Sequence, residues 1–184
     1  MTALLDVPAI RERILRLSPD EYHRWTEGQP TELLRGFVIE KMSKSPLHYK
    51  TIEGLREILT GQIQPGWVLR QEGPLTLADS EPEPDLAVVR GSAEDYWTAH
   101  PATAQLVIEV AVSSLEIDRL KALIYSEAAV QEYWIVCPET KQVEVYRQPS
   151  GAEGYQECMV LSCPAQLECD ALPGMCVDLA ALFR

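Results

Sequence analysis

Features that place a protein in a membrane or on a nucleotide are missing from this sequence of 184 residues. No apolar run approaches the length that spans a bilayer, and the N-terminal residues lack the basic, apolar and small-residue order of a signal peptide. We therefore expect no membrane contact and a cytoplasmic location. Because no glycine-rich loop joins a strand to a helix, neither a dinucleotide site nor a P-loop is indicated.

Cysteine is scarce and odd in number, at five residues. The four nearest the C-terminus are spaced too widely and irregularly for paired C-x-x-C zinc motifs: Cys158, Cys163, Cys169 and Cys176. We therefore expect reduced, buried thiols. No internal repeat or low-complexity stretch occurs, and the length suits one domain. We predict a single domain over residues 1–184, with residues 1–17 as an N-terminal extension.

Positive charge is also in short supply. The chain has 16 Lys and Arg against 28 Asp and Glu, a formal net charge of −12 that argues against a phosphate-rich partner. The deficit is uneven, because residues 1–60 hold nine basic and nine acidic side chains. A polyanion would therefore approach this half, where KMSKSPLHYK supplies Lys41, Lys44, His48 and Lys50. Composition alone favours the alternative, a solvated basic loop.

Hydrophobic patterning predicts helices and strands in mixed order. The expected helices lie at residues 18–27, at 48–63 and from 113 onward. The expected strands are two around a tight turn at Gly36 in residues 31–42, and others at 67–77, 85–89, 106–112, 132–136, 142–147 and 155–161. Strands this apolar need helices over them. We therefore predict an α/β fold with a mixed β-sheet flanked by helices.

The helix that begins near residue 113 carries two further expectations. Ser113 and Glu116 have the spacing of a capping box at its start. Its expected buried face consists of four apolar residues: Leu120, Leu123, Ile124 and Ala128.

Glu109 lies in the middle of LVIEVAVSS, which otherwise has the pattern of a buried strand. A buried carboxylate costs several kcal/mol unless it meets a cation, a metal or hydrogen-bond donors. The alternative is an edge strand on which Glu109 faces water. Asp85 enters the preceding strand directly after Pro84. Neighbouring strands would let the two carboxylates converge and hold Mg²⁺ or Mn²⁺. Taken alone, however, Asp85 is better explained as a turn or strand-entry cap.

Lys121 is the third member of this group. From a helix start near Ser114, it lies roughly 10 Å along the axis, and helical side chains lean back toward the N-terminus. Its ammonium can therefore neutralise Glu109, orient a water or hold a phosphate oxygen. The alternative is a surface lysine paired with Asp118 or Glu116.

Four segments in this order resemble the Uma-two family of restriction endonucleases, within the PD-(D/E)XK nuclease superfamily: TELLRGFVIEKMSKSPLHYKTI, EPEPDLAVV, LVIEVAVSSLEIDRLKALIYSEAAVQEYWIV and LPGMCVDLAALF. The resemblance implies a restriction-endonuclease-like core in which Asp85 and Glu109 match the metal ligands. It also implies that Lys121 matches the family's lysine, displaced from the strand to a helix. Glu32 and His48 match a glutamate and a histidine of the N-terminal motif.

Two residues depart from the expected patterns. Ala111 stands two positions after Glu109, where the superfamily usually has its lysine, so Lys121 must substitute or the enzyme is inactive. In EVAVSS, the proline that the family usually has near the strand end is missing.

The leading hypothesis is a Mg²⁺-dependent (or Mn²⁺-dependent) endonuclease that acts on DNA. Asp85 and Glu109 would hold the metal, Lys121 would position the attacking water, Glu32 would bind the metal or a water, and His48 would contact phosphate. A homodimer is expected because duplex cleavage usually needs two sites. The alternative is a catalytically inactive nuclease-fold module for self-association or regulation of a partner, which Ala111 and the acidic composition favour. Metal binding separates the two hypotheses.

Overall fold

A six-stranded mixed sheet forms the centre of the computed structural model, which describes residues 15–26 and 28–184. In spatial order its strands are β3 (Trp67–Gln71), β4 (Leu86–Arg90), β5 (Leu106–Val110), β6 (Glu132–Cys137), β7 (Gln142–Pro149) and β8 (Tyr155–Ser162). Neighbours run antiparallel except β5 and β6, which are parallel and connected through the helix α4 (Leu115–Glu127). The predicted α/β class with a mixed sheet is confirmed.

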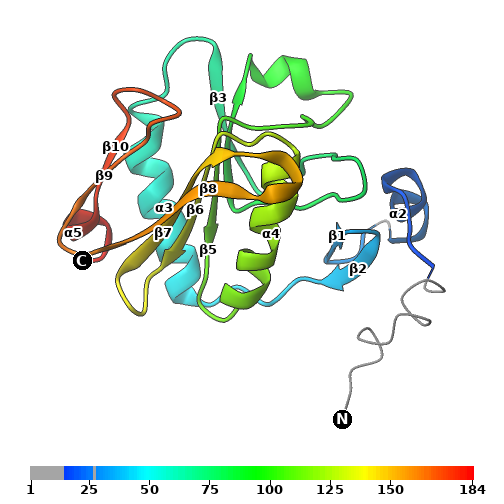
Figure 1. Cartoon of the computed structure of the whole chain (residues 1–184), viewed down its shortest axis with the longest axis horizontal. Coiled ribbons are helices and arrows are strands. Elements are labelled where there is room, and N and C mark those ends of the chain that lie inside the picture. Colours follow the sequence, from blue (N-terminus) through cyan, green and yellow to red (C-terminus); the bar gives the residue numbers. More distant parts are fainter. Residues whose placement is uncertain (1–14, 27) are drawn as a thin grey trace.

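Helices cover both faces of this sheet (Figure 1). The helix α3 (Pro46–Thr60) lies on one face, with the C-terminal elements β9 (Gln166–Glu168), β10 (Cys176–Asp178) and α5 (Leu179–Leu182). The helix α4 covers the other face. Alternation along β5 supplies both apolar layers, because Leu106 and Ile108 pack with α3 whereas Val107 packs with α4.

A separate hairpin consists of β1 (Thr31–Leu34) and β2 (Phe37–Glu40). Its two turn residues, Arg35 and Gly36, have φ of 55° and 79°. Positive φ at both central positions is typical of the tight turns that suit a twisted hairpin. The predicted pair of strands around Gly36 is confirmed.

Backbone contacts attach the hairpin to the loop that leads into β4. Leu33 and Glu81 exchange two hydrogen bonds, at 3.3 and 2.6 Å. The helix α2 (Pro19–Thr26) packs beside β1, where the Tyr22 hydroxyl donates to the Thr31 carbonyl at 2.7 Å. These contacts place Glu32, on β1, close to the start of β4.

Of the apolar face predicted for α4, Ile124 is buried and Ala128 packs partly buried against the core, but the other two residues are exposed. Leu120 and Leu123 are 73% and 40% exposed, whereas Asp118, Lys121 and Tyr125 are buried. Lys121 and Tyr125 are turned toward the sheet because Glu109 on β5 accepts a hydrogen bond from each. A helix can therefore bury its charged face when the sheet supplies the opposite charge.

Three smaller expectations also differ from the structure. Ser114 is the N-cap of α4, and its hydroxyl donates to Asp118 Oδ2 at 2.6 Å, so the predicted capping box does not form. The strand expected at 67–77 ends at Gln71, beyond which Leu75 is buried in a loop. All five cysteines are free, but Cys158 is exposed.

Part of the N-terminal extension, residues 1–14, lies outside the described residues. In the part that the structure describes, no helix has the length and apolar character needed to cross a membrane.

Candidate functional site

Asp85 and Glu109 meet where β4 and β5 lie side by side. The antiparallel register pairs Leu86 with Ile108, so Asp85 and Glu109 are the next residues along their strands. Alternation places both on the α4 side, since Ala87 and Val107 pack in the α4 layer. The Asp85 N–H donates to Glu109 Oε2 at 3.3 Å. The structure thus brings together the two carboxylates that the sequence analysis proposed as metal ligands.

Lys121 reaches this pair from α4. Its Nζ lies 3.0 Å from Glu109 Oε1, 2.9 Å from Glu32 Oε1 and 3.7 Å from Asp118 Oδ1. Lys121 is only 5% exposed, so the alternative of a surface lysine is wrong. Burial alone would lower its pKa, but the Glu109, Glu32 and Asp118 carboxylates outweigh burial and raise the pKa, which keeps the ammonium charged.

The side chain of Glu109 receives different contacts on its two oxygens. Oε1 accepts from Lys121 Nζ at 3.0 Å and from the Tyr125 hydroxyl at 2.9 Å. Among the residues that the structure describes, Oε2 accepts only the long bond from the Asp85 N–H. Burial raises the pKa of Glu109 to about 8; Lys121 opposes this rise, whereas Asp118, Asp85 and Glu32 add to it. Without a further cation, ionisation of Glu109 is therefore costly.

The two carboxylate oxygens of Asp85 also differ in their contacts. Its Oδ2 accepts from the Val110 N–H at 2.8 Å and lies 3.1 Å from His48 Nε2. Within residues 15–26 and 28–184, its Oδ1 has only the Lys44 ammonium as a charged partner, at 3.7 Å. Each carboxylate thus keeps one oxygen fixed by two donors and the other weakly engaged.

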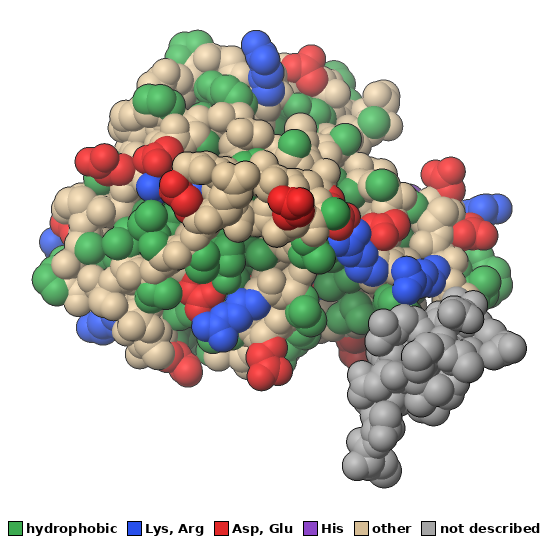
Figure 2. Space-filling view, viewed as in Figure 1, with side chains coloured by type: hydrophobic (Ala, Val, Ile, Leu, Met, Phe, Trp, Pro, Cys, Tyr) green, Lys and Arg blue, Asp and Glu red, His purple; other side chains and the backbone are tan. Residues whose placement is uncertain are grey.

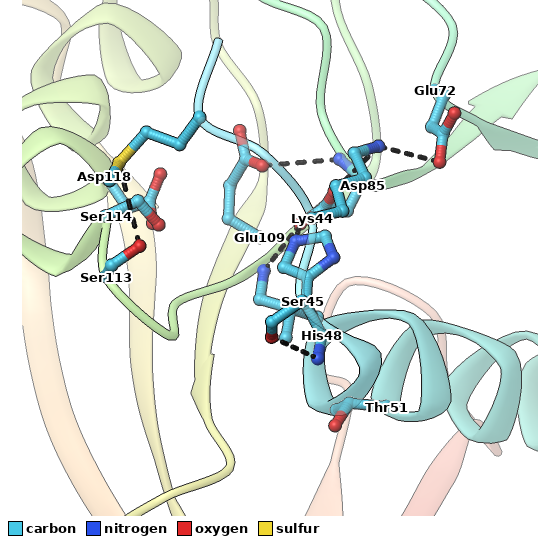
Figure 3. Close-up of polar contacts among 12 residues, drawn as sticks. Lys44, Ser45, His48, Thr51, Glu72, Asp85, Glu109, Ser113, Ser114 and Asp118 are labelled. Atoms are coloured by element: carbon cyan, nitrogen blue, oxygen red, sulfur yellow. Dashed lines mark hydrogen bonds and ion pairs between the residues drawn. The ribbon is translucent and has the colours of Figure 1, made fainter.

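His48 belongs to the first turn of α3. Ser45 is the N-cap, Pro46 opens the helix, and the His48 N–H donates to Ser45 Oγ at 3.2 Å. Figure 3 shows the imidazole ring directed toward Asp85. His48 Nδ1 is buried and, among the described residues, has no hydrogen-bond partner. The geometry places His48 on a carboxylate, whereas the sequence analysis expected a contact with phosphate.

Negative charge exceeds positive charge in this cluster. Glu32, Asp85, Glu109 and Asp118 are each 7% exposed or less. The buried cation among them is Lys121, while Lys44 stands at the rim with its side chain 37% exposed. Burial raises the pKa of Asp118, as it does that of Glu109. Such an excess creates a demand for another cation.

The donor set suits a hard divalent cation. Among residues 15–26 and 28–184, no group of three or more His, Cys, Asp or Glu is arranged to hold a metal ion. Mg²⁺, however, commonly takes one or two carboxylates and completes its octahedron with waters and substrate phosphate. Asp85 Oδ1 and Glu109 Oε2 are the weakly engaged oxygens. Oxygen donors and surplus negative charge therefore fit Mg²⁺ or Mn²⁺.

A cleft opens above these groups, and the segment Lys41–Ser45 between β2 and α3 lines it. Lys41 Nζ lies 2.6 Å from Glu83. Lys44 Nζ lies 2.7 Å from Glu72, as Figure 3 shows. Lys50 does not line the cleft, since its Nζ donates to the Arg184 carbonyl at 2.7 Å.

The surface charge on the face shown in Figure 2 does little to attract a polyanion. Acidic and basic side chains are interspersed on this face. Besides Lys121, the lysines that line the cleft are Lys41 and Lys44, and both already have acidic partners. A phosphate group that binds them must therefore compete with carboxylates.

Asp118 and Tyr125 are site residues that the sequence analysis did not assign. From the sequence, Asp118 was expected only as the ion partner of a surface lysine, and no role was expected for Tyr125. The signal was their spacing from Lys121, three residues before and four after, which places all three on one side of a helix.

Removal of Lys121 should destabilise the metal-free protein far more than neutralisation of Glu109. Lys121→Met should lower the free energy of unfolding by about 3–5 kcal/mol, because it leaves buried carboxylates without a cation. Glu109→Gln should leave that free energy unchanged or slightly higher, since Glu32 and Asp118 still neutralise Lys121. Urea denaturation measures both. A larger loss for Glu109→Gln than for Lys121→Met would show that the charge balance is misjudged.

Comparison with known proteins matches the chain to a family and to a solved structure. A model of the Uma2 family, described as "Putative restriction endonuclease", matches residues 19–180. A crystal structure described as "a putative nuclease belonging to DUF820", from Anabaena variabilis, aligns over 91% of this chain and 97% of its own, with a TM-score of 0.73 and 19% identity. At that identity, the likeness shows the fold alone. Curated proteins gave no match.

Proposed function

The chain belongs to the Uma2 family, and on that premise we propose that it is a Mg²⁺- or Mn²⁺-dependent endonuclease that hydrolyses phosphodiester bonds of DNA. The observation that carries this proposal is the pairing of Asp85 and Glu109 beside the buried ammonium of Lys121, at the base of a cleft. The membership itself confirms the predicted family and implies a nuclease that binds nucleic acid. The metal, the DNA substrate and the residue roles are the proposal.

In this proposal Asp85 Oδ1 and Glu109 Oε2 hold the cation. A divalent cation at this site polarises the scissile phosphate and lowers the pKa of an attacking water. Lys121 positions that water and stabilises the developing negative charge. Glu32 orients the Lys121 ammonium, and His48 orients Asp85 through Oδ2.

In this proposal Lys121 replaces the catalytic lysine that the superfamily usually has on a strand. The chain is then a PD-(D/E)XK nuclease whose lysine is displaced to a helix. Ala111, at the usual lysine position, is buried in the apolar layer under α4 and has no group that can act on a phosphate. Lys121 reaches Glu109 from α4, which covers this face of the sheet, so its ammonium lies beside the carboxylate. A single domain and a homodimer complete the proposal, since duplex cleavage usually needs two sites.

A second candidate is a nuclease-fold module that has lost catalysis and serves self-association or regulation of a partner. The net charge of −12 favours it, as do the acidic partners of Lys41 and Lys44, because both oppose the approach of a polyanion. Such a module has no need of a divalent cation. Metal binding therefore separates the two functions.

Mn²⁺ should raise the melting temperature of the wild-type protein, because a ligand that binds the native state stabilises it by mass action. Asp85→Asn and Glu109→Gln should largely abolish this rise. Glu144→Gln is a matched control, since Glu144 is also a buried strand carboxylate but pairs with Arg119 outside the cleft. Its metal-dependent rise should equal that of the wild type.

Cleavage of plasmid and single-stranded DNA, with and without Mn²⁺, is the activity arm of the same experiment. The wild type should cleave only with metal, and both ligand variants should lose cleavage. If metal raises the melting temperature but no DNA is cleaved, the assignment of the metal site stands and the proposed nuclease activity is refuted. No response to metal in the wild type would favour the second candidate.

Nucleic acid should enter over Lys41 and Lys44. The double variant Lys41→Ala/Lys44→Ala should weaken binding of an inactive Asp85→Asn background to DNA and should flatten the salt dependence, because fewer counterions are released. Lys50→Ala is the control, as Lys50 lies outside the cleft. Fluorescence anisotropy over a salt series measures both, and an equal effect of Lys50→Ala would refute this path of entry.

A further inference from the structure

Tyr125 brings a second donor to Glu109. Its hydroxyl lies 2.9 Å from Glu109 Oε1, the same oxygen that accepts from Lys121. Tyr125 is fully buried and follows Lys121 by four residues on α4, so the two side chains extend from one side of the helix. The hydroxyl therefore has a defined target in the site.

The ring of Tyr125 is held in place by its neighbours. It packs against Tyr133 with ring centroids 4.9 Å apart and an interplanar angle of 58°. Tyr133 is itself fully buried, and the contact with Tyr125 is made by its ring. Burial, followed by the charge of Glu109, raises the pKa of Tyr125 well above its usual value, so the hydroxyl keeps its proton.

Lys121 alone does not fix the orientation of Glu109. Its ammonium is shared among Glu109, Glu32 and Asp118, at 3.0, 2.9 and 3.7 Å. The Asp85 N–H adds only a long bond of 3.3 Å to Oε2. The terminal torsion of a glutamate is broad, so a carboxylate held by a shared ammonium and one long bond can rotate about it. A second, directional donor on Oε1 limits that rotation.

We propose that Tyr125 is a positioning residue of the metal site, which holds Glu109 Oε1 so that Oε2 faces the cation beside Asp85 Oδ1. The inference rests on the proposed function, because it requires that a divalent cation binds between these two carboxylates. Hydrogen-bond partners that orient metal ligands commonly contribute about 10- to 100-fold in metal affinity. Tyr125 therefore acts on the metal through Glu109 and does not itself touch it.

The test compares two variants that each remove one buried hydroxyl. Tyr125→Phe removes the donor to Glu109, whereas Tyr133→Phe removes an equally buried donor whose acceptor is the backbone carbonyl of Asp118. The metal-free melting temperature of both, measured with circular dichroism, reports the structural cost of losing the hydroxyl. The dissociation constant for Mn²⁺, measured by isothermal titration calorimetry at fixed pH, reports the site.

Tyr125→Phe should raise the dissociation constant for Mn²⁺ by about 10-fold or more. Tyr133→Phe should leave it close to the wild-type value, even where the two variants lose similar melting temperature. An unchanged constant in Tyr125→Phe, or equal increases in both variants, would overturn the inference, since neither is consistent with a contact specific to Glu109.

The wild-type titration keeps this result apart from the proposed function. If wild-type protein does not bind Mn²⁺, the proposed metal site fails, and the inference falls with it. If wild-type protein binds Mn²⁺ and Tyr125→Phe binds it equally well, the metal site stands and only the role of Tyr125 is refuted.

Discussion

The burial of one lysine among carboxylates is the constraint on which the site depends. Lys121 contacts Glu32 from the β1–β2 hairpin, Glu109 from β5 and Asp118 from its own helix. These contacts tie three elements together and make the burial of the acidic groups tolerable. They also leave an excess of negative charge, because Asp85 adds a further carboxylate. An excess of buried negative charge does little for the stability of the fold. It does favour the binding of a divalent cation.

Much of the fold could be predicted because apolar alternation and helical spacing mark the elements. The apolar run of β5 and the turn at Gly36 are local signals, and the structure has both elements where they were expected. The prediction held only in part for α4, where apolar periodicity indicated Ile124, which is buried, but also Leu120 and Leu123, which are exposed. Periodicity assumes that burial follows hydrophobicity, and this assumption breaks down where a sheet presents a carboxylate to the helix.

The sequence brought attention to Asp85, Glu109 and Lys121 because charges in apolar surroundings are conspicuous, and the structure places the three together. It did not indicate which oxygen of each carboxylate is occupied, since that depends on the β4–β5 register and on donors from distant segments. The role of Tyr125 could not be predicted from the sequence for a similar reason. A tyrosine in a helix is ordinarily a core residue, and only the position of Glu109 gives its hydroxyl a partner.

Anomalous scattering from crystals grown with Mn²⁺ tests the central claim most directly, because it locates the metal independently of activity. The account predicts one anomalous peak between the two strands, roughly 2–2.5 Å from both Asp85 Oδ1 and Glu109 Oε2, with Lys121 still in contact with Glu109 Oε1. A peak at another site, or none at saturating Mn²⁺, would contradict it.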